Sequence, residues 1–362
     1  KRLRAIRRRF CEGGEAKQDF LACQQEYSDA MIELLSQIVD KTIQSLDQPP
    51  CEFALLNVGS LARRELQLYS DLDLAIVIER KEDQKHPYFQ SFITLFKVSL
   101  DLLEDHDCML RIDSGDLAHC QAPSYDMLDT VEGYLTQYSP NDPHCPETEA
   151  YGLYRSSYLC GSAEGKPLFL KYQSEVMKRL REAKVLESLS LRNLKHHVEE
   201  WIKQERYYKG KAVIDIKERY IKPLLYAIQD LGFYFGVALK DEMIISNTSE
   251  LLQLLVDRKH LNERFKEDYR KSLCDGHQLR QKLHRVYGRQ EDCYVRQVSD
   301  DRGEAGTASE LDHGDGVPQW ILRLDDKEQA SLDWIDELIL RPLYRCLSYL
   351  YNHHQPDDRW YS

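Results

Sequence analysis

Residues 59–78 read GSLARRELQLYSDLDLAIVI, and this stretch decides the fold of the first half of the chain. One apolar run, residues 53–58, precedes the Gly-Ser pair, and another, residues 74–78, follows the Asp-Leu-Asp triplet. Both runs have strand length and little polarity, which predicts two buried neighbouring strands. Because side chains alternate along a strand, we expect Asp71 and Asp73 to point to the same face.

The two aspartates and the Gly-Ser pair together indicate phosphate chemistry. Neighbouring carboxylates repel each other unless a divalent cation lies between them, and Mg²⁺ (or Mn²⁺) takes oxygen ligands of this kind. Gly59 lets the backbone approach a bound anion because it has no side chain. Paired aspartates, a metal ion and a phosphate-binding turn are the components of metal-assisted phosphoryl or nucleotidyl transfer. The alternative is an acid-rich boundary between a loop and a strand.

Gly-Ser, a spacer and Asp-x-Asp resemble the signature of the polymerase-β-type nucleotidyltransferase superfamily. The spacer resembles that of the uridylyltransferases of the PII protein, the adenylyltransferases of glutamine synthetase and uncharacterised nucleotidyltransferases with a helical substrate-binding domain. The residues that carry this resemblance are Arg63, Glu65, Leu66, Tyr69, Ser70 and Asp71. Ala62 and Arg64 stand where the pattern usually has glycines, so we expect a stiffer loop here.

The resemblance implies an α+β fold, in which a polymerase-β-like domain with a mixed sheet and flanking helices precedes an α-helical domain. It implies that Asp71 and Asp73 hold the metal ion and act in catalysis. A third catalytic carboxylate is expected from Asp113 on an adjacent strand, with Asp107 and Asp116 as the alternatives. The residues expected to bind the nucleotide in this half are Gly59, Ser60, Arg63 and Ser70.

The pattern along the chain predicts three parts. Residues 1–50 are expected to form helices that pack on the catalytic domain, with a break at Gly13 and Gly14. Residues 51–172 form the nucleotidyltransferase domain. Residues 173–362 form the helical substrate-binding domain, in which the stretch 299–317 is rich in glycine and acidic residues and is expected to be a mobile loop.

One residue of the second half is expected at the nucleotide. The run IDIKER, residues 214–219, followed by a proline-bearing helix, resembles the helical domain of the uncharacterised nucleotidyltransferases. The resemblance predicts that Lys217 binds the triphosphate across the cleft between the domains; the alternative is a charged helix end. Further on, Asn247, Thr248 or Ser249 is the expected N-cap of a leucine-rich helix.

Composition excludes several classes of function. The net charge of -12 over 362 residues argues against a nucleic-acid binder, which is usually basic. The ten cysteines include no C-x-x-C pair and suit a reducing cytoplasm. The longest apolar runs have strand length, so no membrane partner is predicted.

These observations predict a Mg²⁺-dependent nucleotidyltransferase. It would move AMP or UMP from ATP or UTP to an acceptor hydroxyl, expected on a protein, and release pyrophosphate. A second hypothesis is a catalytically silent nucleotide-binding protein that regulates a partner through its helical half, although such a protein need not keep both aspartates. A nucleotidyltransferase acting on RNA ends is disfavoured by the acidity of the chain.

Overall fold

The chain divides into two compact units. The first comprises Lys1–Ser190 and Leu231–Leu255, and the second Leu191–Asp230 and Val256–Ser362. The predicted boundary at residue 172 falls inside helix α7 (Gly165–Arg181) of the first unit. The assignment of a catalytic and a substrate-binding domain stays a prediction. The computed structural model describes residues 2–16, 19–103, 128–137, 153–182, 185–208, 213–240, 243–288, 291–295 and 322–353.

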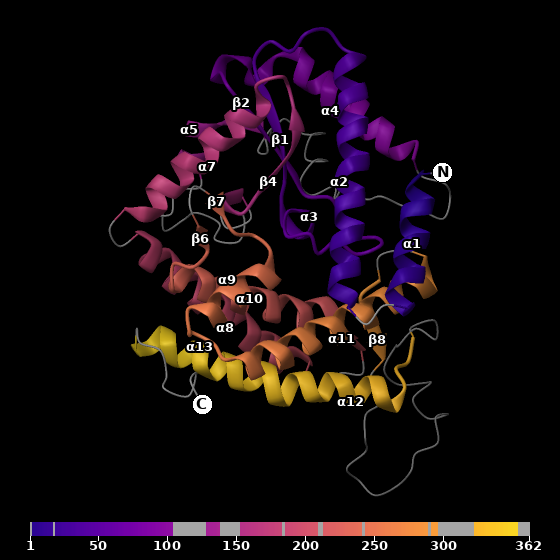
Figure 1. The fold of residues 1–362 in the computed structure, drawn as a ribbon, viewed down its shortest axis with the longest axis vertical. Helices are drawn as coiled ribbons and strands as arrows, with labels where there is room; N and C mark the ends of the chain where they lie inside the picture. Colours follow the sequence, from indigo (N-terminus) through magenta and orange to yellow (C-terminus); the bar gives the residue numbers. More distant parts are fainter. Residues whose placement is uncertain are drawn as a thin grey trace, which may run out of the picture. The chain divides into compact units, whose positions relative to one another are not determined.

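A four-stranded mixed sheet forms the centre of the first unit (Figure 1). Its strands lie in the order β3-β2-β1-β4. Strand β1 pairs antiparallel with β2 and β4, and β2 pairs parallel with β3. Every residue of β1 and β2 is buried, so the predicted pair of buried neighbouring strands is confirmed. The bounds are β1 (Phe53–Asn57), β2 (Leu74–Ile78), β3 (Leu128–Thr130) and β4 (Ser157–Gly161).

Two N-terminal helices, α1 (Arg2–Ala16) and α2 (Phe20–Gln44), precede the sheet. The predicted break at Gly13 and Gly14 is wrong, because α1 continues to Ala16. A glycine inside a helix costs only about 1 kcal/mol relative to alanine, a cost that packing can offset. Such packing is present: the ring of Phe10 stacks on that of Tyr27 in α2 at 4.6 Å.

Helices cover both sides of the sheet, which lies between α2 and α7 in Figure 1. Helix α4 (Pro87–Asp101) packs on β1, where the Phe53 ring meets those of Phe89 and Phe92 at 5.7 and 5.3 Å. Helix α5 (Val131–Gln137) is joined to β2 by Tyr134, whose hydroxyl donates to the carbonyl of Ile76 at 3.1 Å. Helices around a small mixed sheet make an α+β fold, as predicted. The smaller elements are a 3₁₀ turn (Lys81–Lys85) and the strand pair β6 (Leu239–Lys240) and β7 (Met243–Ile244).

The second unit is mainly helical, with one short antiparallel pair of strands, β5 and β8. Two π-helical turns, η3 and η4, each lead directly into an α-helix whose second residue is a proline, Pro223 or Pro342. A wider π turn avoids the clash between a proline ring and the preceding turn. Helices α8 (Val185–Tyr208) and α9 (Lys222–Tyr234) belong partly to each unit, and α10 (Thr248–Asp257) belongs mainly to the first. The other bounds are β5 (Val213–Asp215), η3 (Lys217–Ile221), α11 (Glu263–Tyr287), β8 (Cys293–Val295), α12 (Asp326–Trp334), η4 (Ile335–Leu340) and α13 (Arg341–His353).

None of the helices in the described ranges combines the length and apolarity needed to cross a membrane.

Candidate active site

The Gly-Ser pair lies directly after β1, at the start of the four-residue helix α3 (Gly59–Ala62). Gly59 has a φ of +58°, in the left-handed region that residues with a side chain rarely adopt. A Cβ atom at Gly59 would lie only 2.1 Å from Oδ2 of Asp73. The Asp73 carboxylate therefore occupies the space that a side chain at residue 59 would need. The structure brings these two predicted site residues together.

Asp71 and Asp73 lie immediately before β2 and are both half-buried, whereas Leu72 between them is 1% exposed. This alternation agrees with the prediction that the two carboxylates point to the same side. The Val58 N–H donates to the Asp73 carbonyl at 2.9 Å, so the pairing of β1 with β2 continues as far as the aspartates. The sheet thus fixes the main chain of Asp73 beside the Gly-Ser turn.

The other predicted nucleotide ligands of the first unit make contacts inside the loop. The Ser60 carbonyl accepts the N–H of Glu65 at 2.8 Å. The Arg63 guanidinium Nε lies 2.8 Å from Oε2 of Glu65, and Ser70 Oγ accepts the N–H of Gln67 at 3.1 Å. The loop 63–70 is therefore a folded turn with its own hydrogen bonds. Nucleotide binding by Ser60, Arg63 and Ser70 stays a prediction.

Arg64 occupies a left-handed backbone conformation, with a φ of +59°. The related pattern has a glycine at this position, and the structure supplies the physical reason, since only glycine adopts this conformation without strain. The Arg64 guanidinium lies 3.0 Å from the carboxylate of Asp29 on α2, and both side chains are about half exposed. An exposed pair of this kind contributes about 0–1 kcal/mol, which offsets the backbone strain only in part.

Helix α2 holds the loop through three side chains on one of its faces. Gln24 Nε2 donates to the carbonyl of Glu65 at 2.8 Å. Ser28 Oγ accepts the N–H of Leu66 at 3.0 Å, and the Tyr27 hydroxyl donates to the carbonyl of Leu68 at 3.3 Å. Residues at i, i+3 and i+4 share a helix face, so α2 presents a row of polar groups to the main chain of the loop.

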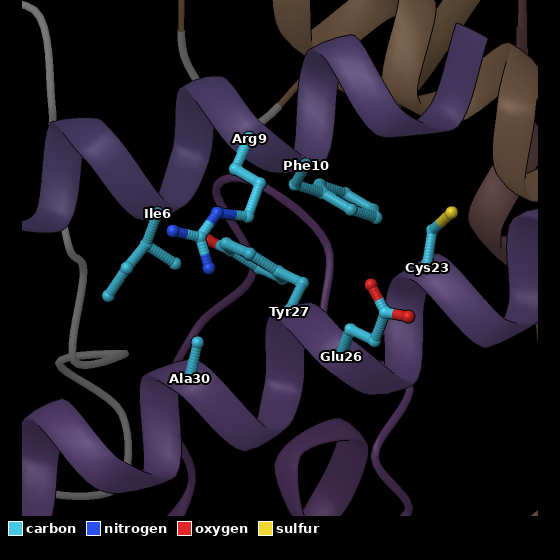
Figure 2. A pocket seen from close by; sticks show the side chains of 7 residues that line it. All are labelled: Ile6, Arg9, Phe10, Cys23, Glu26, Tyr27 and Ala30. Carbon is cyan, nitrogen blue, oxygen red and sulfur yellow. The ribbon is translucent and has the colours of Figure 1, made fainter. Parts of the chain in front are cut away.

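A pocket of about 510 Å³ lies between α1 and α2, and Tyr27 is one of the residues that line it. Figure 2 shows the side chains of Phe10, Arg9 and Tyr27 meeting in the space between the two helices. Burial raises the pKa of the Tyr27 hydroxyl to about 12, against the lowering effect of Arg7, so it stays protonated and able to donate to the loop. The lining residues are Ile6, Arg9, Phe10, Cys23, Glu26, Tyr27 and Ala30.

A segment far along the chain, residues 246–248, also contacts the loop; we call it the anchor segment. Ser246 Oγ donates to the carbonyl of Ala62 at 3.1 Å, and Asn247 Nδ2 to the carbonyl of Arg63 at 2.7 Å. The Thr248 N–H donates to Oε1 of Glu65 at 3.1 Å. Sequence reasoning missed this docking.

The one part of the anchor segment that the sequence did signal is its cap. Asn247 Oδ1 accepts the N–H of Glu250 at 3.0 Å, so the predicted N-cap of α10 is confirmed. The side-chain amide of Asn247 thus serves both α10 and the loop, since its nitrogen donates to Arg63. The local pattern predicts only the first of these roles.

Lys217 belongs to the second unit and is the first residue of the π turn η3. The neighbouring Asp215 accepts the N–H of Glu218 at 2.8 Å, and burial, with the charge of Asp292 adding to it, raises the pKa of Asp215 to about 6. Nucleotide binding by Lys217 stays a prediction.

Buried charges support η3 and the strand pair β5–β8. The Arg280 guanidinium contacts the Asp292 carboxylate at 2.5 and 3.2 Å, and His284 Nε2 lies 3.1 Å from the same carboxylate. Burial opposes ionisation of Asp292, but His284 and Arg280 together hold its pKa well below the usual range. Burial lowers the pKa of His284 despite its bond to Asp292.

The predicted third carboxylate, Asp113, and its alternatives Asp107 and Asp116 lie outside the described residues. Within the described part, strand β3 beside β2 carries a buried aspartate, Asp129. It pairs in register with Val77 and lies 2.6 Å from the ammonium of Lys81. Val77 lies four residues beyond Asp73, about 13 Å along the sheet, so Asp129 does not complete the site.

The model of the family described as "Putative nucleotidyltransferase DUF294" matches residues 1–118. These residues belong to a nucleotidyltransferase-type family. The match contains the whole Gly-Ser to Asp-x-Asp stretch and ends before the second unit. No curated protein matches the chain. The nucleotidyltransferase assignment therefore applies to the part of the chain in which Gly59 and Asp73 lie together.

Proposed function

We propose that this nucleotidyltransferase transfers AMP or UMP from ATP or UTP to an acceptor hydroxyl on a protein. The observation that carries the proposal is the packing of the Asp73 carboxylate against Gly59, in a segment that matches a nucleotidyltransferase family. Gly59 has no side chain, so the turn leaves room for a phosphate group. The two carboxylates beside it can bind the divalent cation that accompanies the phosphate. The choice of nucleobase and of acceptor follows from the resemblance to the uridylyl- and adenylyltransferases.

The donor set fits a hard divalent cation. Among the described residues no group of three His, Cys, Asp or Glu side chains could hold a metal ion. Mg²⁺ is commonly held by one or two carboxylates, with phosphate and water oxygens as its other ligands. Asp71 and Asp73, half-buried before β2, meet that requirement and would hold the ion. When bound, the ion would neutralise phosphate charge and orient the triphosphate.

The chain's own groups would position the reactants. Gly59 gives the triphosphate close access to the main chain, and Ser60 offers a hydroxyl. The acceptor oxygen would form a bond to the α-phosphorus as the bond to the bridging oxygen breaks, and pyrophosphate would leave with the electron pair. The hydroxyl proton would pass to a carboxylate, for which Asp113 is the proposed base.

Lys217 is proposed as a further ligand of the triphosphate, on the resemblance of the IDIKER run. A single ammonium next to phosphate makes a charge-assisted contact, so Lys217→Ala is expected to weaken nucleotide affinity by about 1–3 kcal/mol. Calorimetric titration of ATP and UTP into both proteins measures this. Equal affinities would mean that Lys217 does not bind the nucleotide and that residues of the first unit alone hold it.

A labelling experiment tests the transfer. The protein is incubated with Mg²⁺, each NTP labelled at its α-phosphate in turn, and a cell lysate, and labelled protein is then sought. We expect label from ATP or UTP, and none with Asp73→Asn, which removes one anionic ligand of the doubly charged ion. Asp101→Asn, at an exposed position at the end of α4, is the matched control and should label like the parent.

The alternative, a catalytically silent nucleotide-binding regulator, makes a different prediction in the same experiment. It would bind Mg²⁺ and nucleotide in calorimetry and yet produce no labelled protein and no pyrophosphate. Full labelling by Asp73→Asn would refute the two-carboxylate site in either case.

A further inference from the structure

The loop between Ser60 and Asp71 carries the proposed phosphate turn at one end and the proposed metal ligands at the other. The sheet holds Asp73 beside Gly59, so a shift of this loop would move the other proposed ligands that the loop carries relative to that fixed pair. Besides the hydrogen bonds within the loop, polar side chains from elsewhere hold its main chain: Gln24, Tyr27 and Ser28 of α2 on one side, and the anchor segment on the other. The loop therefore takes its position from groups that are not themselves in the proposed site.

The side chain of Glu65 engages the anchor segment. Its carboxylate is 6% exposed and makes two contacts, one oxygen with Arg63 Nε at 2.8 Å and the other with the Thr248 N–H at 3.1 Å. Its own carbonyl accepts from Gln24 and its own N–H donates to Ser60. Residue 65 thus links α2, the Gly-Ser turn, the loop and the first residue of α10.

The anchor segment is itself fixed. The buried Arg155, two residues before β4, donates through Nη2 to the Ser246 carbonyl at 3.1 Å. Thr248 is fully buried. The contact from Glu65 to Thr248 therefore ties the loop to a rigid support, because a buried polar group that lost its partner would cost about 1–3 kcal/mol.

We infer that Glu65 is a positioning residue, which receives the Thr248 N–H and thereby sets the position of the proposed nucleotide ligands in the loop, Arg63 and Ser70. This inference rests on the proposed function. It assigns the anchor segment a part in nucleotide binding through its contacts with the loop. Misplacement of a binding group by about 1 Å can cost about 100-fold in rate, so a small shift of the loop is sufficient.

Substitution of Thr248 isolates the contact. Thr248→Pro removes the main-chain N–H that the Glu65 carboxylate accepts, at the first residue of α10, where proline is compatible with a helix. Thr248→Ala keeps that N–H and changes only the side chain, so it is the matched control. Glu65→Ala removes the acceptor from the other side, and Glu65→Gln keeps an oxygen for the Thr248 N–H.

The readout is the affinity for Mg²⁺–ATP and Mg²⁺–UTP by calorimetry, well below the melting temperature of each protein. We expect Thr248→Pro and Glu65→Ala to bind about tenfold more weakly than the parent, as for the loss of one buried contact. Thr248→Ala should bind like the parent, and Glu65→Gln should recover most of the affinity. A purely structural role would lower melting temperatures and leave these affinities unchanged.

Two outcomes separate this inference from the proposed function. If the parent binds nucleotide and both Thr248→Pro and Glu65→Ala bind it equally well, Glu65 is not a positioning residue, and the proposed function stands. If the parent binds no nucleotide, the proposed function fails first and the inference falls with it. Should Thr248→Pro not fold, the comparison of Glu65→Ala with Glu65→Gln decides alone.

Discussion

The two regions with predicted nucleotide ligands are held in place by different kinds of contact. In the first unit, α2 and the anchor segment make hydrogen bonds to carbonyl and N–H groups of the loop, and the carboxylate of Glu65 contacts Arg63. In the second unit, the surroundings of Asp215 are ordered by buried charges, chiefly Arg280 with Asp292. Main-chain contacts tolerate many side-chain changes, whereas a buried charge left without its partner is costly. The first region should therefore respond to substitution mainly in function, and the second mainly in stability.

The largest effect on stability is expected in the second unit. Arg280→Met leaves Asp292 buried without its guanidinium and should lower the free energy of unfolding by about 3–5 kcal/mol. Lys203→Ala, which removes an exposed pair with Glu200 in the same unit, is the control and should cost about 0–1 kcal/mol. Urea denaturation of both variants measures the difference. If both variants lost less than about 1 kcal/mol in the free energy of unfolding, the second region would not depend on its buried charges as proposed.

A substitution at Gly59 tests whether the first region responds to substitution mainly in function. Gly59→Ala places a Cβ in the left-handed region, at a cost of about 1–2 kcal/mol, and against the Asp73 carboxylate. Gly288→Ala is the matched control, because Gly288 has a φ of +62° and no atom within 4 Å of the Cβ position. Both should lose stability, but only Gly59→Ala should lose α-phosphate labelling. Parental labelling by Gly59→Ala would show that the contact with Asp73 has no catalytic importance.

The pH dependence of stability tests the buried charges around Asp215. Its pKa rises from 3.8 in the unfolded chain to about 6 in the fold, so the folded state binds the proton more tightly. Its contribution therefore favours folding below pH 3.8 and is lost as pH rises through about 6. Asp215→Asn keeps an acceptor for the Glu218 N–H but cannot ionise. The variant should gain stability relative to the parent across this window, measured by denaturation at several pH values; a constant difference would contradict the assignment.

The smallest effect is expected at Arg64. Arg64→Gly relieves the left-handed backbone but loses the exposed pair with Asp29, so it should stabilise the protein by about 0–1 kcal/mol. Lys259→Gly is the comparison in the second unit, because Lys259 also has a positive φ, +62°. Among the described contacts Lys259 has no ion pair to lose, so the substitution should give the full gain in stability. Urea midpoints rank the two. A clear loss at Arg64 would mean that its side chain matters more than its backbone.

The sequence predicted what depends on neighbours along the chain. The buried strands followed from two apolar runs, and the partnership of Gly59 with Asp-x-Asp followed from the turn that joins those strands. Contacts between distant segments could not be predicted in this way. The sequence around Ser246 and Thr248 does not indicate that these residues contact the loop. Both contacts involve main-chain groups, which every residue type has, so no sequence pattern marks them. The length of α1 was also misjudged, since packing of Phe10 on Tyr27 outweighs the weak helix preference of Gly13 and Gly14.

The distance along the chain between the loop and the anchor segment has a consequence for biosynthesis. Arg63 and Asn247 are 184 residues apart. At a synthesis rate of about 5–20 residues per second, the loop emerges roughly ten to forty seconds before its anchor exists. During that interval the nascent chain can form the sheet but cannot lock the loop, so the site is completed late. A truncated chain that ends near Ser190 would keep every residue of the Gly-Ser to Asp-x-Asp stretch and its contacts with α2, and would still lack the hydrogen bonds from the anchor segment.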